Sequence, residues 1–254
     1  MSWAARRRFI ILLILGIVIA AFLTIVLIAT LYKTPTCTDG VQNQNELGID
    51  CGGPCVYLCS SQEQPPTVLF TEVLQNIVGR TDVVAMVENK NTNAAAKHVP
   101  YRITLYGVNQ TFIQEVDGTL DLPPGTTVPV YVPNIASGKQ KVTQAFLDVD
   151  ASAPRWFIMF SDSRAVPTVS NTMKNGTASE PRIDALLTNP GATSMANVQA
   201  IVLVYDARKN IIAASQTIVP TIPGQGQAVA TFTWNSAFSR TPALIEVVPI
   251  IPLP

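Results

Sequence analysis

The sequence is short of charge and of histidine. Only 13% of its 254 residues are charged, the 17 basic and 17 acidic side chains cancel to a formal net charge of zero, and there is one histidine. Globular proteins usually carry about 25% charged residues. Without a basic excess to neutralise phosphates, the composition excludes an evident nucleic-acid binder. The 48% hydrophobic content excludes a disordered chain, which needs high charge and low hydrophobicity.

Catalytic signatures are lacking as well. His98 is the only available imidazole base for a Ser-His-Asp or Cys-His arrangement, and it lies in a polar stretch that predicts a loop. The sequence contains no G-x-S-x-G, H-E-x-x-H or G-x-x-x-x-G-K-[ST] motif. Asp148 and Asp150 could be read as paired carboxylates for glycoside hydrolysis. They fall on one face of an alternating segment, however, so we interpret them as residues on the solvent-exposed side of a strand. We therefore predict no enzyme and no catalytic residues.

One long hydrophobic run is present, at the N-terminus. Residues 9–32 carry no charge, and the cluster Arg6, Arg7 and Arg8 precedes them. A helix of about 24 residues spans about 36 Å, enough to cross the hydrocarbon core of a bilayer. The positive-inside rule then places residues 1–8 in the cytoplasm and everything after the helix outside it.

A cleaved signal peptide is the main alternative to a retained anchor. Its apolar region usually runs about 7–15 residues and ends at a small-residue cleavage site. The run here is longer, and small pairs such as Val18 and Ala20 lie in mid-span. We therefore predict a single transmembrane helix over 9–32, with a buried soluble helix as a further alternative. A component of a pilus or secretion assembly is another, although the Gly-Phe cleavage site and early glutamate of pilins are missing.

All four cysteines fall in one short segment: Cys37, Cys51, Cys55 and Cys59. An even number of cysteines outside the cytoplasm predicts two disulfides, and four cysteines permit three pairings that the sequence does not distinguish. Their spacings lack the paired C-x₂-C knuckles of zinc sites, and an iron–sulfur cluster does not suit this location. We predict a Cys-rich segment and linker over 33–65, with a polar, proline-ended stretch at 60–66.

Oxygen-bearing side chains are concentrated in the same segment. Asp39, Asn43, Glu46 and Asp50 are the types of ligand that calcium prefers, and a loop containing glycine could bring them together. The alternative, which we favour, is that these side chains form turns by bonding their own backbone. Calcium is thus the one possible cofactor, and no other is predicted.

The same residues carry a resemblance. The run D-G-x-x-N-x-x-E-x-x-x-D-C-G-G-x-C, from Asp39 to Cys55, resembles short Cys-rich "DCGG" segments in secreted and surface proteins of bacteria and archaea. The resemblance implies an extracytoplasmic spacer or adhesive module, not a reaction.

The rest of the chain repeats with a period near 100. The matching landmarks are Asn89 with Asn189 at an offset of 100, Leu105-Tyr106 with Val204-Tyr205 at 99, Pro124-Gly125 with Pro223-Gly224 at 99, and the segment Ala145 to Val149 with the segment Ala243 to Val247 at 98. A unit of this length suits a β-sandwich, whereas solenoid repeats run about 20–50 residues. We predict β-sandwich domain 1 over 66–160 and domain 2 over 161–254.

Each copy has the patterns of short strands. Residues 101–106 and 128–132 alternate between polar and apolar, which puts one face into a core. Residues 198–205 are almost continuously apolar and predict a central strand. Turn residues such as Pro-Gly and Asn separate the runs. The fold class predicted is all-β: two tandem antiparallel sandwiches after a transmembrane helix and a disulfide-rich segment.

A second resemblance appears at two strand ends, Leu105-Tyr106 and Val204-Tyr205-Asp206. The order of an apolar strand ending in Asn, an apolar "LY(D)" strand, a polar turn, an Ile-rich strand and a Pro-Gly turn resembles FxLYD-type immunoglobulin-like domains of bacterial and archaeal envelope proteins. The first copy departs from the pattern because Gly107 replaces the acid. The resemblance implies tandem Ig-like, envelope-associated, noncatalytic domains.

These features predict a function class. We expect an extracytoplasmic structural or interaction protein, anchored in the cell membrane, that presents its domains to an envelope or cell-surface protein. The alternative is a receptor-like module for a small ligand or ion, with the Cys-rich segment or the interdomain groove as its site. The aromatic segment 156–160 between the copies is either an exposed binding patch or, as we prefer, a last strand or packed hinge.

Overall fold

The computed structural model describes residues 3–31, 36–77, 79–152, 154–160 and 162–254. Parts of the predicted segments lie outside these residues: positions 1–2 of the tail, position 32 of the helix, positions 33–35 of the Cys-rich segment and position 161 at the domain boundary. The chain divides into two compact units, residues 1–56 and 57–254, which are described in turn.

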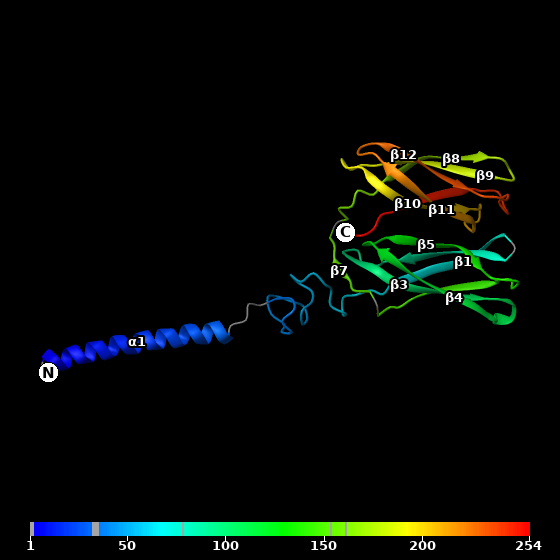
Figure 1. Ribbon diagram of the computed structural model, residues 1–254. Coiled ribbons are helices and arrows are strands. Elements are labelled where there is room, and N and C mark those ends of the chain that lie inside the picture. The colour runs from blue at the N-terminus through cyan, green and yellow to red at the C-terminus, as the bar shows by residue number, and fades with distance from the viewer. Residues whose placement is uncertain (1–2, 32–35, 78, 153, 161) are drawn as a thin grey trace. The chain divides into compact units, whose positions relative to one another are not determined.

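The first unit begins with one long helix, α1 (Trp3–Leu31) (Figure 1). Its interior has no proline, and the hydroxyls of Thr24 and Thr30 donate to the carbonyls of Ala20 and Val26, at 2.8 Å each, so they need no outside partner. The span Arg6–Thr30 has a mean hydropathy of 3.3, and none of its most apolar window is buried. The prediction of one N-terminal helix long and apolar enough to cross a membrane is confirmed.

The second unit consists of strands. Those in its described residues are β1 (Thr67–Ile77), β2 (Arg80–Glu88), β3 (Ala94–Tyr106), β4 (Phe112–Leu122), β5 (Thr127–Ala136), β6 (Gln144–Val149), β7 (Phe157–Ile158), β8 (Thr168–Gly176), β9 (Pro181–Thr188), β10 (Met195–Tyr205), β11 (Ile211–Ile222), β12 (Gln227–Thr233) and β13 (Leu244–Ile250). They form four antiparallel sheets with the orders β1-β2-β5, β4-β3-β6, β12-β9-β8 and β11-β10-β13, and β7 pairs with β3. The predicted all-β class is confirmed.

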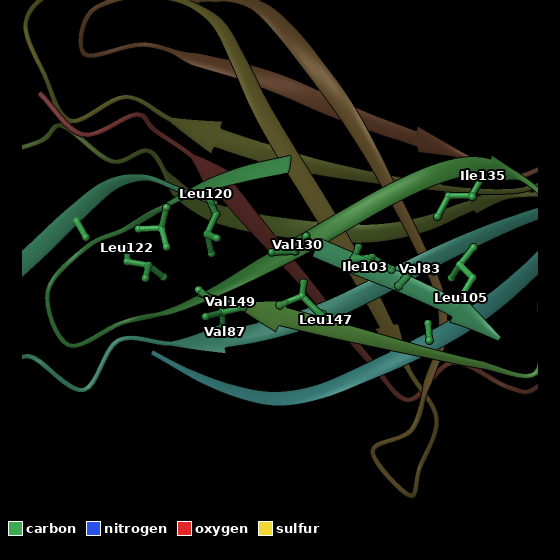
Figure 2. Close-up of a cluster of buried hydrophobic side chains, with 14 of the residues drawn as sticks. Val83, Val87, Ile103, Leu105, Leu120, Leu122, Val130, Ile135, Leu147 and Val149 are labelled. Atoms are coloured by element: carbon green, nitrogen blue, oxygen red, sulfur yellow. The ribbon is translucent and has the colours of Figure 1, made fainter. Parts of the chain in front are cut away.

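The first core lies between the sheets β1-β2-β5 and β4-β3-β6. Val83, Ile103 and Leu122 are fully buried there, and Figure 2 shows such side chains from both sheets in one cluster. Buried and exposed residues alternate along β6, as expected for a strand with one wet face. Trp156 is also in this core, and β7 follows directly after it, which favours our preferred interpretation for residues 156–158, whereas Phe160 at the end of the segment is exposed.

The second core lies between the sheets β12-β9-β8 and β11-β10-β13. Ile183, Leu187 and Phe232 are buried there together with Val202 from β10. Trp234 closes one side of this core, and its indole N–H donates to the Ala214 carbonyl at 3.2 Å. The two cores each join two sheets, so the unit contains two β-sandwiches.

The two sandwiches follow the same strand order, with β1 to β6 matched by β8 to β13. The repeated asparagines make equivalent hydrogen bonds in both sandwiches. Asn89 Nδ2 donates to the carbonyls of residues 94, 122 and 123, and Asn189 Nδ2 donates to those of residues 193, 222 and 223. Both residues are 1% exposed. A buried amide that satisfies several loop carbonyls at once explains why Asn stands at this position in each copy.

Two of the predicted offsets differ from the structure. The Asn contacts align Pro123 with Pro223, an offset of 100, where the Pro-Gly letters had suggested 99. Tyr106 is paired with residue 144 and Tyr205 with residue 244, so β6 and β13 also correspond at 100 instead of 98. A slip of two residues keeps every side chain on its original face, and for this reason the strand pattern could not reveal it.

Residues 57–64, assigned in part to a linker, are fastened to the first sandwich. Leu58 is in the first core, and its N–H donates to the Trp156 carbonyl at 3.0 Å. Asn91 and Gln64 are joined twice, through Gln64 N–H to Asn91 Oδ1 at 2.9 Å and Asn91 Nδ2 to the Gln64 carbonyl at 2.7 Å. The division between the units thus falls after residue 56, ahead of the predicted boundary at 65.

Candidate functional site

The two sandwiches pack face to face through a third apolar cluster. Val84 and Met86 of β2 meet Ile201 and Leu203 of β10 in this cluster, which we call the middle layer. Its remaining buried members are Leu74 and Ala214. Figure 1 shows the resulting stack of four sheets, with β5 and β1 next to β10 and β11. Because β2 and β10 are covered on both faces, their sequences are almost continuously apolar.

The repeat allows the middle layer to be compared with the outer face of β3. Ile201 and Leu203 of β10 correspond to Arg102 and Thr104 of β3, since Tyr205 corresponds to Tyr106. Arg102 is exposed, and its Nε donates to Asp117 Oδ1 at 2.9 Å on the neighbouring strand. This outer face is therefore charged where its counterpart is apolar.

The outer face of β9 differs from β2 in the same way. The offset of 100 aligns Val84 with Asp184, whose carboxylate accepts hydrogen bonds from Arg182 Nε at 2.9 Å, Thr231 Oγ1 at 2.7 Å and Asn175 Nδ2 at 2.7 Å. These hydrogen bonds lower the pKa of Asp184, although its burial opposes them. Polar outer faces at both ends are what a repeat stack needs where stacking stops.

A cavity of about 350 Å³ opens beside the middle layer, between the two sandwiches. Its apolar wall includes Val130 of β5, Ile201 of β10 and Val248 of β13. Its polar lining includes Tyr101 of β3 and Asp121 of β4. Cavities of this size at domain boundaries are common ligand sites.

The charged groups at this cavity are paired with one another or with backbone. The Arg164 side chain is 10% exposed and donates to both oxygens of Asp162, at 2.8 and 2.6 Å, and to the carbonyl of Ile251. The Arg164 guanidinium lowers the pKa of the Asp162 carboxyl. Asp121 accepts the backbone N–H groups of His98 at 2.8 Å and Leu253 at 2.9 Å. The C-terminal segment is thereby fixed to both walls of the cavity.

The acid of the "LYD" pattern has a structural role in the second copy. Asp206 accepts the N–H groups of Arg208 and Asn210 at 2.9 Å and the Arg240 Nη1 at 2.7 Å, and these bonds hold the pKa of Asp206 far below its usual range. In the first copy, where Gly107 replaces the acid, the turn is closed by the Gly107 N–H to the Thr111 carbonyl at 2.8 Å and by the Thr111 hydroxyl to the Val108 carbonyl at 2.9 Å.

The predicted disulfides are present. Cys37 forms a disulfide with Cys55. Cys51 and Cys59 are also disulfide-bonded, and the described residues contain no free cysteine. Cys37, Cys55 and Glu46 bring three ligand atoms within 4.8 Å of one another. A disulfide sulfur is not a thiolate, however, so this group does not suit a metal ion.

The four predicted calcium ligands hydrogen-bond within their own segment. Both oxygens of Asp50 accept the Gly40 N–H, at 3.1 and 2.9 Å. Asn43 Nδ2 donates to Asp39 Oδ2 at 2.9 Å, and Glu46 Oε2 accepts the N–H groups of Asn43 and Asp50 at 3.3 Å. In the part of the chain that the structure describes, no three of these acids converge within 4.8 Å. The contacts favour the turn-forming alternative, and the calcium site stays a prediction.

Other predicted residues lie on the surface. The prediction of a loop at His98 was wrong, because His98 lies in β3, where it is exposed with a positive φ of 49°; among the described residues no hydrogen bond to its imidazole is found. Asp148 is exposed on β6, as expected for the solvent-facing side of the strand, and Asp150, directly after β6, is exposed as well. Arg6, Arg7 and Arg8 are exposed, and the Arg7 guanidinium lies 5.5 Å from the centre of the Trp3 ring. The orientation they predict for the helix stays a prediction.

Sequence reasoning missed the Arg164–Asp162 pair and the attachment of the C-terminal segment. Their partners, Ile251 for Arg164 and Leu253 for Asp121, are distant along the chain, and no local pattern signals such contacts. The one available hint was a pair of opposite charges two residues apart in an otherwise irregular stretch.

Comparison with known proteins gives no family. No protein-family model matches the chain, and no curated protein matches it. Among solved structures, a red sea bream transglutaminase is similar over 73% of this chain and 29% of its own, with 13% identity and a TM-score of 0.26. A beta-glucuronidase from glycoside hydrolase family 2 is similar over 83% of this chain and 26% of its own, with 10% identity and a TM-score of 0.21. Likeness this slight carries no argument about activity.

Proposed function

We propose that this protein is a membrane-anchored interaction protein that presents two rigidly joined sandwiches to a protein partner outside the cytoplasm. The observation that carries the proposal is α1, whose side chains after the arginine cluster, from Phe9 to Thr30, are exposed and almost all apolar. An unburied stretch of this length is stable in a bilayer and aggregates in water. The arginine cluster at its start sets the proposed orientation.

The middle layer supports a presenting role for the sandwiches. Two domains joined by a flexible linker would sample many orientations, whereas a shared apolar layer holds one. A rigid surface loses less entropy when a partner binds. The tie between Gln64 and Asn91 extends this order to the segment where the chain enters the first sandwich.

An exposed aromatic cluster gives such a partner a place to bind. Tyr106 of β3 contacts Phe112 of β4 and Phe146 of β6, with ring centres 6.4 and 5.9 Å apart. Phe112 and Phe146 are each 56% exposed. Aromatic side chains grouped on an otherwise charged sheet face are enriched at protein interfaces. We assign this cluster as the proposed contact for the partner.

Membrane attachment and orientation are tested with the full chain in its native cells. The full chain should remain in the membrane fraction after alkaline carbonate washing, and a chain starting at Lys33 should be released. A C-terminal epitope should be digested by protease added to intact cells or spheroplasts, and an N-terminal epitope should be protected. Release of the full chain by carbonate, or protection of the C-terminal epitope, would overturn this part of the proposal.

The partner is tested by photo-crosslinking and purification from those membranes. The double variant Phe112→Ser, Phe146→Ser should lose a partner that wild type recovers in fixed stoichiometry. Phe160→Ser is the matched control, since Phe160 is 81% exposed and outside the cluster. Equal recovery by the double variant would rule out the aromatic contact, and the lack of any stoichiometric partner would rule out the interaction role.

A further inference from the structure

We infer that the cavity between the two sandwiches is a binding site for an uncharged, largely apolar small molecule. This goes beyond the proposed anchoring and partner contact, and it rests on observations within residues 57–254 alone.

Size and lining favour a small organic molecule over an ion. The cavity measures about 350 Å³, within the usual range of about 300–1,000 Å³ for ligand pockets. Its wall is built from both sandwiches, with Val128 and Val130 on one side and Ile201, Val248 and Ile250 on the other. Burying apolar ligand surface against such a wall releases water and is favourable.

The state of the charges excludes a strongly charged ligand. The Arg164 guanidinium is held by both oxygens of Asp162, and Asp121 is occupied by two backbone N–H groups. An anionic ligand would face the carboxylates of Asp121 and Asp162, while a cationic ligand would compete with Arg164 for Asp162. In either case the ligand would give up its hydration without a new partner, which is costly. An uncharged molecule avoids this cost.

Polar groups remain to orient the ligand. The Tyr101 hydroxyl has no hydrogen bond among the described residues, and its ring lies over Gly118, where a Cβ would come within 2.3 Å of the ring. Burial raises the pKa of Tyr101, so the phenol is neutral and able to donate. Gln199 donates its Nε2 to Gln216 at 3.1 Å, and its carbonyl oxygen is left as an acceptor. A ligand with one hydrogen-bonding group at the edge of an apolar body fits these features.

The test uses the full chain in lipid nanodiscs, with methyl-labelled isoleucine and valine, and indole as the probe. Indole should cause saturable shifts of the methyl signals of Val130, Ile201 and Val248, and empty nanodiscs correct for partitioning into lipid. Indole-3-acetate and tryptamine, which carry opposite charges on the same ring, should bind at least about tenfold more weakly. Tyr101→Phe should weaken indole binding several-fold without changing the other methyl signals.

The matched variants separate cavity binding from general stickiness. Val248→Trp fills the cavity and should abolish the shifts, while Val229→Trp, on the exposed outer face of β12, should leave them unchanged. If Val248→Trp does not fold, Val166→Trp fills the cavity from another wall. Indole binding that survives cavity filling, equal binding of the charged probes, or no saturable shift would overturn the inference. None of these outcomes depends on membrane orientation or on a protein partner, so this test and those above fail independently.

Discussion

The two sandwiches have the same strand order, yet the faces that meet and the faces that do not are built from different residues. Where they meet, β2 and β10 present Val84, Ile201 and Leu203. The corresponding outer positions hold Asp184, Arg102 and Thr104. A single substituted layer thus decides whether one sandwich joins another. Strand order alone therefore does not define a rigid module, because the chemistry of each face determines how many sandwiches stack.

The largest expected effect comes from the middle layer. Leu203→Ala removes fully buried side-chain atoms and should lower the free energy of unfolding by about 2–5 kcal/mol. Thr104→Ala, at the matching outer position, should change it by less than about 0.5 kcal/mol. Urea unfolding followed by the fluorescence of Trp156 and Trp234, one in each core, measures both. Equal losses for the two variants would contradict the distinction between the faces.

Substituting the buried asparagines should have the second-largest effect on stability, and the effect should be similar in the two copies. Asn89→Ala and Asn189→Ala each leave loop carbonyls without their buried donor, which costs about 1–3 kcal/mol for a group left unsatisfied. The same unfolding experiment should give similar losses for both variants. If one variant lost much of its unfolding free energy and the other lost none, the equivalent contacts in the two copies would not contribute equally to stability.

The pH dependence should distinguish the two turns. Hydrogen bonds lower the pKa of Asp206 in the folded state, so its contribution to stability is present above the ordinary carboxyl pKa of about 3.9 and is lost as the pH falls through the lower folded value. Asp206→Ala should therefore flatten the decline in stability of wild type below about pH 4. Glycine occupies the matching position in the first copy, and Gly107→Ala should leave that decline unchanged. Melting temperatures between pH 2 and 7 test this, and an unaltered acid decline in Asp206→Ala would count against it.

The smallest effect should come from the charged outer face. Arg102 and Asp117 are both exposed, and an exposed ion pair contributes little to stability because water and salt screen it. Arg102→Ala should therefore change the unfolding free energy less than the asparagine substitutions do, and the change should shrink in 1 M salt. Arg102→Ile instead restores the residue type of the matching inner position. Sedimentation velocity should detect whether this variant self-associates through the outer face of β3. A monomer at all concentrations would show that one apolar substitution is not enough to let a further sandwich pack there.

Local patterns predicted much of the fold. The uncharged run predicted α1, the alternation around Ile103 and Leu105 predicted strands with one wet face, and the offset between Asn89 and Asn189 predicted a repeat. The almost continuous apolar run at 198–205 predicted a central strand, and β10 is the middle strand of its sheet. Which strand would cover it could not be predicted, because that depends on contacts between residues distant in sequence.

The cavity was beyond prediction for the same reason. Its lining comes from both sandwiches and from the C-terminal segment, and its charge balance depends on Arg164 reaching the carbonyl of Ile251. The attachment of 60–66 to the first sandwich could not be predicted, because a polar, proline-ended stretch has the composition of a linker whether or not it is hydrogen-bonded to a domain. Its fastening depends on Asn91, a residue with no distinctive sequence context.

The two hydrogen bonds between Gln64 and Asn91 have a mechanical consequence. A pull on the chain ahead of Tyr57 reaches these two hydrogen bonds before it reaches β1. Part of the load then passes to the loop that contains Asn91 and is held by the buried Asn89 side chain. Asn91 and Asn89 are themselves hydrogen-bonded, with Asn91 Nδ2 donating to Asn89 Oδ1 at 3.0 Å. Force applied ahead of Tyr57 would therefore be resisted first by the contact between Leu58 and Trp156 and then by this short chain of amides, before it reached β1.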